Sequence, residues 1–282
     1  MPIVYNQNNF FDLVEGRSDD AFDPTPPRYR ILVEGDSWVS HPLLRNLAHQ
    51  LDILGGDDFG ILNLAVPGDT AENLLDRHGR QLKQIGQLIA TTTYGYKFDL
   101  IFISAAGNDI VGEELQCYID EYSDGIDDAA TLLNAGFDRA VDLAVKGYEN
   151  LIKLRNRSRA NKTTPIVTQT YCYLEPRLVG TKFFGRSLGK GWIKCYLDLK
   201  KIPHEQQPGV VVEMLTRFHD RLTELESKYS GFYVVDTRKA LLKYGKPHLP
   251  WFHDEIHPTN EGFEKVAEVI QKRMKSEGVW FS

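Results

Sequence analysis

The chain has 282 residues, 42% of them hydrophobic, so it can bury a full core as one large α/β domain or as two smaller ones. Its net charge of -6 argues against nucleic acid or another polyanion as the main partner. No apolar run approaches membrane-spanning length, and three widely spaced cysteines favour reduced thiols over a disulfide framework or a zinc site.

Residues 1–28 are interpreted as an N-terminal arm. The arm ends in Asp23-Pro24-Thr25-Pro26-Pro27, which is too rich in proline for a helix or an inner strand. Residues 1–20 carry acidic side chains and lack an apolar h-region, so they do not form a secretory signal. We therefore expect a cytoplasmic protein, with leaderless export left open.

Strands and helices alternate along the rest of the chain. Short apolar runs predict strands at about residues 30–34, 59–65, 99–104, 165–169 and 231–236. Helical spacing of apolar residues predicts helices that begin at His41-Pro42 and near residue 70, and helices at about 137–159, 210–229 and 260–274. Such alternation implies a parallel sheet covered on both faces. We predict one α/β domain over residues 29–282, with inserts at about 112–135 and 171–209.

Four short polar segments fall where these strands end or where the last helix begins. Ser37 follows the first strand at Gly35-Asp36, at the sheet edge where open α/β sheets bind ligands. Gly-Asp-Ser alone is compatible with an ordinary surface turn. The other segments are Gly68, Gly107-Asn108-Asp109 and Asp254-x-x-His257, and together the four argue for a reactive site.

With these segments in this order, the chain resembles the SGNH hydrolases, also called GDSL esterases and lipases. The resemblance spans about residues 30–275 and implies the SGNH hydrolase fold, a flavodoxin-like three-layer α/β/α arrangement with a five-stranded parallel sheet. It also implies cleavage of a carboxylic ester through an acyl-serine intermediate. Trp38 departs from the family tetrapeptide, which ends in Leu, and this changes the packing beside the nucleophile.

The resemblance assigns a role to each residue. Ser37 is the nucleophile, His257 the base and Asp254 the residue that orients the base. The oxyanion hole consists of the backbone N–H groups of Ser37 and Gly68 and the side-chain amide of Asn108. A glycine at 68 would keep a side chain from blocking the substrate.

General chemistry supports the same roles. A serine hydroxyl is a poor nucleophile until a base takes its proton, and a histidine titrates near neutrality. A carboxylate on the other ring nitrogen fixes the tautomer of the base. Pro258 favours an extended backbone at His257, which places the Asp254-His257 pair on a loop. This mechanism requires no metal and no organic cofactor.

Two other functions remain open. The same residues permit acyl transfer to an acceptor other than water, and a binding protein could retain a hydrolase scaffold without activity. For catalysis, the expected substrate is a small-molecule, lipid or carbohydrate ester. The sequence specifies neither the acyl chain, nor the alcohol, nor the oligomeric state.

Several motifs compete with this interpretation. Gly185-Arg186-Ser187-Leu188-Gly189 matches the nucleophile elbow of α/β-hydrolases but lacks a convincing strand before it and a helix after it. Residues 120–125 resemble the start of a calcium loop, but Tyr122 stands at a ligand position and Thr131 replaces the closing Glu, so we interpret the acidic run as a solvated loop. His253 competes with His257 as the base without an aspartate at the matching spacing. Cys172 is interpreted as a small buried residue.

The two inserts leave the carboxyl ends of strands, so both are expected to border the crevice. Residues 112–135 are acidic, whereas residues 171–209 combine aromatic and cationic side chains. We expect the second insert to form a lid or wall of the substrate pocket, with Phe183 and Phe184 influencing substrate preference and its glycines allowing movement. The alternative is a surface for self-association.

Overall fold

The structure, a computed structural model, describes residues 4–5, 27–71, 80–90, 96–183 and 186–281. Six parallel strands form the main sheet in the order β1-β3-β2-β4-β5-β8. Their bounds are β1 (Val4–Tyr5), β2 (Tyr29–Gly35), β3 (Phe59–Asn63), β4 (Leu100–Ser104), β5 (Ile166–Gln169) and β8 (Phe232–Val235). The five predicted strands are therefore present, and the N-terminal arm adds β1 as a short edge strand that the sequence analysis did not anticipate.

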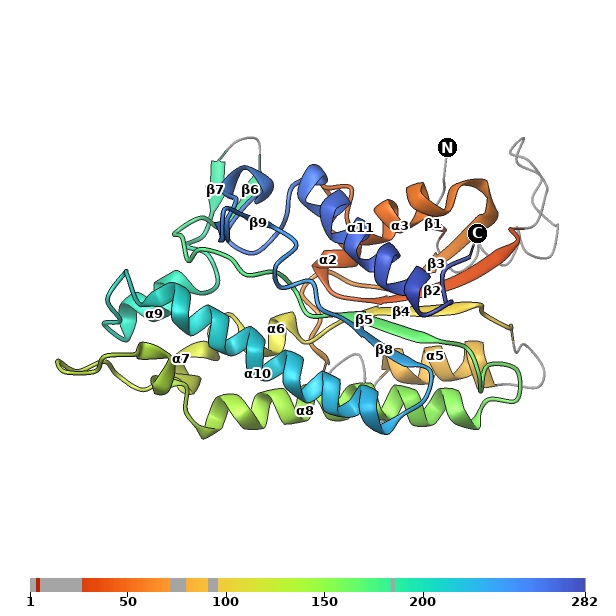
Figure 1. Cartoon of the computed structure of the whole chain (residues 1–282), viewed down its shortest axis with the longest axis horizontal. Coiled ribbons are helices and arrows are strands. Elements are labelled where there is room, and N and C mark those ends of the chain that lie inside the picture. The colour runs from red at the N-terminus through yellow and green to blue at the C-terminus, as the bar shows by residue number, and fades with distance from the viewer. Residues whose placement is uncertain (1–3, 6–26, 72–79, 91–95, 184–185, 282) are drawn as a thin grey trace.

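Helices cover both faces of this sheet (Figure 1). One face carries α3 (Leu47–Gly55) and α11 (Asn260–Ser276), which pack against each other. The opposite face carries α5 (Arg80–Ala90), α8 (Ala135–Arg157) and α10 (Gln207–Lys228). The predicted three-layer α/β/α fold is thus confirmed. No helix in the described part of the chain is long and apolar enough to cross a membrane.

The strand order reverses beside β2, the first long strand. The chain passes from β2 to β3 on one side and then returns to β4 on the other, the flavodoxin-like order that leaves a crevice at the strand carboxyl ends. Gly35 and Ser104 are register partners at this point. A Cβ at Gly35 would lie 2.1 Å from the Ser104 carbonyl oxygen, so only glycine permits the ends of β2 and β4 to approach so closely.

The helix predicted to begin at His41-Pro42 begins later in the structure, at Leu47. A four-residue helix, α2 (Ser37–Ser40), follows β2, and His41 ends it. The next helix, α3, starts at Leu47 because the Asn46 side chain accepts the backbone N–H groups of Ala48 and His49. The predicted start at His41-Pro42 is therefore wrong. The helix predicted to begin near residue 70 is described only in part: residues 72–79 lie outside the described part of the chain, and Arg80–Ala90 form α5.

Short elements surround the carboxyl end of the sheet. They are α6 (Gly107–Ile110), α7 (Leu115–Tyr118), η2 (Ala129–Leu132), β6 (Thr181–Phe183), β7 (Arg186–Leu188), α9 (Lys194–Leu199), β9 (Leu242–Lys243), β10 (Lys246–Pro247) and η3 (Leu249–Trp251), while η1 (Gly56–Asp58) precedes β3. The two inserts contact each other: Gly112 N–H donates to the Trp192 carbonyl at 2.9 Å, and Tyr122 N–H donates to the Lys200 carbonyl at 2.9 Å. They therefore form one continuous structure beside the crevice.

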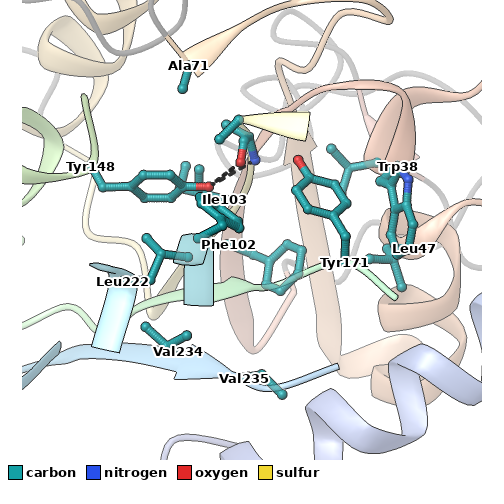
Figure 2. Close-up of a cluster of buried hydrophobic side chains, with 14 of the residues drawn as sticks. Trp38, Leu47, Ala71, Phe102, Ile103, Tyr148, Tyr171, Leu222, Val234 and Val235 are labelled. Atoms are coloured by element: carbon teal, nitrogen blue, oxygen red, sulfur yellow. Dashed lines mark hydrogen bonds between the residues drawn. The ribbon is translucent and has the colours of Figure 1, made fainter. Parts of the chain in front are cut away.

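The core continues directly beneath this end of the sheet. Figure 2 shows the rings of Trp38 and Tyr171 side by side and the Tyr148 ring next to Ile103. The Tyr148 hydroxyl donates to the Ala105 carbonyl at 2.7 Å and accepts the Ala105 N–H at 3.0 Å. Because Tyr148 belongs to α8, these bonds attach that helix to the segment that leads from β4 into α6.

Candidate active site

Ser37, His257 and Asp254 form a connected chain of hydrogen bonds. Ser37 Oγ lies 2.7 Å from His257 Nε2, and His257 Nδ1 lies 2.8 and 3.0 Å from the two Asp254 carboxylate oxygens. The neutral tautomer with its proton on Nδ1 satisfies both contacts, since it donates to Asp254 and accepts from Ser37. Asp254 and His257 are buried, whereas Ser37 is partly exposed. The structure thus brings together three residues that the sequence separates by up to 220 positions.

The loop before α11 holds Asp254 in its charged form. Its Oδ1 accepts the backbone N–H groups of Ile256 at 3.0 Å and His257 at 2.8 Å. Burial alone would raise the pKa of Asp254, but the bonds from His257 and Ile256 hold that pKa below its usual value. Asp254 and His257 lie on a loop rather than within a helix, as predicted from Pro258. An ionised Asp254 can stabilise an imidazolium at His257.

The other two predicted segments lie next to each other across the crevice. The Asn108 amide donates to the Asp69 carbonyl at 2.7 Å, and this bond uses one of its two hydrogens. Gly68 precedes Asp69 in an exposed turn with φ of +86°. A Cβ at Gly68 would meet no atom within 4 Å, so the left-handed backbone, rather than protein crowding, explains this glycine. The turn is fixed on its other side, where Val66 N–H donates to the Gly35 carbonyl at 3.2 Å.

The chain is similar to known proteins over most of its length. Residues 32–265 match the GDSL-like lipase/acylhydrolase family. The chain belongs to this family. No curated protein matches the chain. Membership in the GDSL-like family supports hydrolase activity of the esterase, lipase or acyltransferase type.

Solved structures agree with this fold. A lipase from a goat rumen metagenome has a TM-score of 0.54 at 14% identity, covering 87% of this chain and 97% of that one. A protein from Streptococcus pneumonia has a TM-score of 0.52 at 17% identity, covering 97% and 92%. A carbohydrate acetylesterase family member from Sinorhizobium meliloti has a TM-score of 0.50 at 15% identity, covering 88% and 98%. At these identities the likeness shows the fold alone.

In this GDSL-like protein, Tyr171 connects two of the four segments, which the sequence analysis did not anticipate. Its hydroxyl donates to Asp36 Oδ2 at 2.6 Å and accepts the Gly107 N–H at 2.9 Å. Tyr171 has a left-handed backbone (φ 57°), and its N–H and carbonyl are bound by the buried side chains of Gln169 and Thr237. The segment that contains Ser37 is therefore attached to the segment that contains Asn108.

The charge at Asp36 is governed by the same contacts. Burial raises the pKa of Asp36 to about 6, opposed by the hydrogen bonds from Tyr171 and from the Trp38 N–H. Trp38 packs edge-on against Tyr171, with ring centroids 5.0 Å apart, and against Phe263 at 5.6 Å. A large aromatic ring thus occupies the position next to Ser37.

Glu255, also unanticipated, attaches the second insert to the loop that carries His257. Its buried carboxylate accepts four backbone N–H groups, those of Arg177 at 3.0 Å, Ile193 at 2.9 Å, Lys194 at 2.8 Å and Trp192. Burial raises the pKa of Glu255, and these four bonds oppose that rise.

This anchoring determines which part of the insert lies next to His257. The Trp192 ring lies edge-on to the His257 ring, with centroids 5.3 Å apart. Gly191 has φ of +88°, and a Cβ there would lie 2.3 Å from Glu255 Oε2. Gly191 therefore permits close contact with Glu255, whereas the sequence analysis assigned the insert glycines to movement. Phe184 lies outside the described residues, as does the side chain of Phe183.

One group in the described part of the chain could hold a metal ion. His41, Asp254 and His257 each offer a ligand atom, and these atoms lie within 4.8 Å of one another. His41 Nδ1 already accepts the Leu43 N–H at 3.2 Å. Burial, followed by the nearby His257, lowers the pKa of His41 to about 4, so the ring stays neutral. Since His257 bonds both Asp254 and Ser37, a metal ion there would compete with that hydrogen-bond chain.

The competing motifs occupy other environments. Ser187 lies in β7, which pairs with β6 in a separate two-stranded sheet. His253 Nε2 is buried and has no hydrogen-bond partner among the described residues. Cys172 is buried, donates to the Thr237 carbonyl at 3.1 Å, and has its pKa raised by burial. Residues 120–125 are mostly exposed, and Asp120 accepts from the Asn134 amide at 2.9 Å.

Proposed function

We propose that the protein hydrolyses a carboxylic ester through an acyl-serine intermediate on Ser37. The observation that carries the proposal is the 2.7 Å contact between Ser37 Oγ and His257 Nε2, with Asp254 2.8 Å behind the ring. A nucleophile, a base and an orienting carboxylate in this geometry are what acyl transfer requires. The connected geometry favours catalysis over a role restricted to binding.

The reaction has two halves. Ser37 Oγ bonds to the carbonyl carbon while its proton passes to His257 Nε2, and the carbonyl electron pair moves onto oxygen. As this oxyanion collapses, the carbon–oxygen bond to the alcohol breaks and His257 returns the proton to the departing oxygen. Water then attacks the acyl carbon and gives a proton to His257. The second collapse breaks the bond to Ser37, which regains the proton as the acid leaves.

The proposed oxyanion donors are the backbone N–H groups of Ser37 and Gly68 and the second amide hydrogen of Asn108. Asn108 and Ser37 line the same pocket, and the bond to Asp69 fixes the Asn108 side chain before substrate arrives. Donors fixed in advance stabilise developing charge without reorganisation, which makes them effective. Tyr171 supports this arrangement because it holds the Asn108 segment beside Ser37.

Covalent labelling tests the proposal. A fluorophosphonate probe should label the wild type and the Ser187→Ala control, and should fail to label Ser37→Ala. His257→Ala should lower kcat for ester hydrolysis by several orders of magnitude, because serine and base act as a unit. His253→Ala is the matched histidine control and should cost far less. Labelling that persists in Ser37→Ala, or a larger loss in His253→Ala, would contradict the assignment.

Product analysis distinguishes hydrolysis from acyl transfer. Reactions run with and without an acceptor alcohol should release the free acid at the same rate if water is the natural acceptor. Predominant formation of a new ester at low alcohol concentration would instead identify an acyltransferase with the same site.

A further inference from the structure

An apolar pocket opens directly beside Ser37. It encloses about 520 Å³, including the part open to solvent. Apolar side chains dominate its lining, among them Ile110 and Val111 at the end of α6, Leu174 and Ile193 in the second insert, and Val211, Met214 and Leu215 on α10. Residues 211, 214 and 215 lie at helical spacing, so one face of α10 is presented to the pocket. The first insert adds no residue to this lining among those described, although it packs on the second.

The position of the pocket relative to Ser37 indicates which part of an ester it would hold. In the tetrahedral intermediate, the acyl carbon is bonded to Ser37 Oγ, the oxyanion faces Asn108 and the departing oxygen faces His257. Ser37 and Asn108 line the pocket, whereas His257 does not. The remaining substituent of the carbon, which is the acyl chain, therefore points into the pocket.

Two further polar side chains of the lining, those of Asp36 and Cys172, are already bonded within the protein. The Asp36 carboxylate accepts from Tyr171 and from the Trp38 N–H, and the Cys172 thiol donates to Thr237. The walls offer hydrocarbon surface from Ile, Val, Leu and Met side chains. Such a pocket gains binding energy from methylene groups and offers little to a hydroxylated chain.

We propose that this pocket binds a linear hydrocarbon acyl chain longer than acetyl, an inference that rests on the proposed ester hydrolysis. Each buried methylene contributes about 0.8 kcal/mol, or about a fourfold factor in kcat/KM. For 4-nitrophenyl esters, butanoate should exceed acetate about 15-fold in kcat/KM, and hexanoate should exceed butanoate. A flat profile, or one highest for acetate, would overturn the proposal.

Two substitutions one position apart on α10 provide a matched test. Val211→Phe fills the pocket and should lower the hexanoate-to-acetate ratio of kcat/KM at least tenfold. Val212 is 42% exposed, and Val212→Phe should leave the ratio and the activity unchanged. Met214→Ala enlarges the pocket and should move the preferred ester to a longer chain. An unchanged ratio in folded Val211→Phe protein would exclude this pocket as the acyl site.

A binding measurement separates failure of the pocket from failure of the proposed function. If the wild type hydrolyses none of the esters, calorimetry with neutral methyl ketones and the Ser37→Ala protein still tests the pocket. Affinity should rise about fourfold per methylene and should fall in Ser37→Ala/Val211→Phe but not in Ser37→Ala/Val212→Phe. Affinity that is independent of chain length would overturn the acyl-chain assignment whatever the activity.

Discussion

Replacement of Glu255 by Gln tests whether this carboxylate holds the second insert against His257. Oε1 accepts from Arg177 and Lys194, and Oε2 accepts from Trp192 and Ile193. An amide keeps one oxygen and turns an NH2 group toward two of these donors, which lose their acceptor. A buried donor without a partner costs about 1–3 kcal/mol, so the free energy of unfolding should fall by about 2–6 kcal/mol.

The loss should be near the lower end of this range. Whichever oxygen the NH2 group replaces, one of the two donors that lose their acceptor is Lys194 or Trp192, and since both residues are only partly buried, that N–H group can reach water once the loop moves. Such a movement also separates the Trp192 ring from His257. We therefore expect a drop in kcat/KM for ester hydrolysis at temperatures well below unfolding, and urea denaturation of the same samples gives the stability change.

Glu175→Gln, an isosteric change elsewhere in the same insert, is the matched control for Glu255→Gln. Gly191→Ala should reproduce both effects, because its Cβ would collide with Glu255 Oε2. If Glu255→Gln changes the free energy of unfolding by less than about 0.5 kcal/mol and leaves kcat/KM unaltered, the reasoning is refuted, since surface substitutions have effects of that size.

Two further predictions concern the oxyanion and a buried acid. Asn108→Ala should lower kcat by about 100- to 1,000-fold with little change in KM, whereas a rise in KM at constant kcat would indicate ground-state binding instead. Glu34 is buried, and burial raises its pKa to about 8, so between pH 4.5 and 8 ionisation favours the unfolded chain and wild-type stability should fall as pH rises. Glu34→Gln cannot ionise, so its gain in urea midpoint over wild type should grow from pH 5 to pH 8; an equal difference at both pH values would contradict this.

The sequence predicts much of the fold because its signals are local. Continuous apolar runs locate the central strands; three polar segments follow the ends of strands, and the fourth precedes the last helix. Ser37, Asn108 and the Asp254-His257 loop can therefore be placed at one edge of the sheet before the structure is known. The late start of α3 also has a local signal, the Asn46 cap, which the leucine periodicity before it obscures.

The contacts that hold the site together could not be predicted in this way. Glu255 binds backbone N–H groups, which nearly every residue possesses, so its partners in the insert leave no trace in the sequence. Tyr171 reaches Asp36 only because Gln169 and Thr237 stabilise an unusual backbone conformation. Both depend on the way distant loops pack together.

The separation of Ser37 from His257 has a consequence for the newly made chain. The two residues are 220 positions apart, and at about 5–20 residues per second ribosomal synthesis needs about 10–45 s to cover that interval. During this time Ser37 lacks the imidazole that the proposed mechanism uses as its base, and a serine alone is a poor nucleophile. Under the proposed mechanism, a nascent chain therefore cannot hydrolyse an ester until the loop before α11 brings His257 to Ser37 at the start of α2.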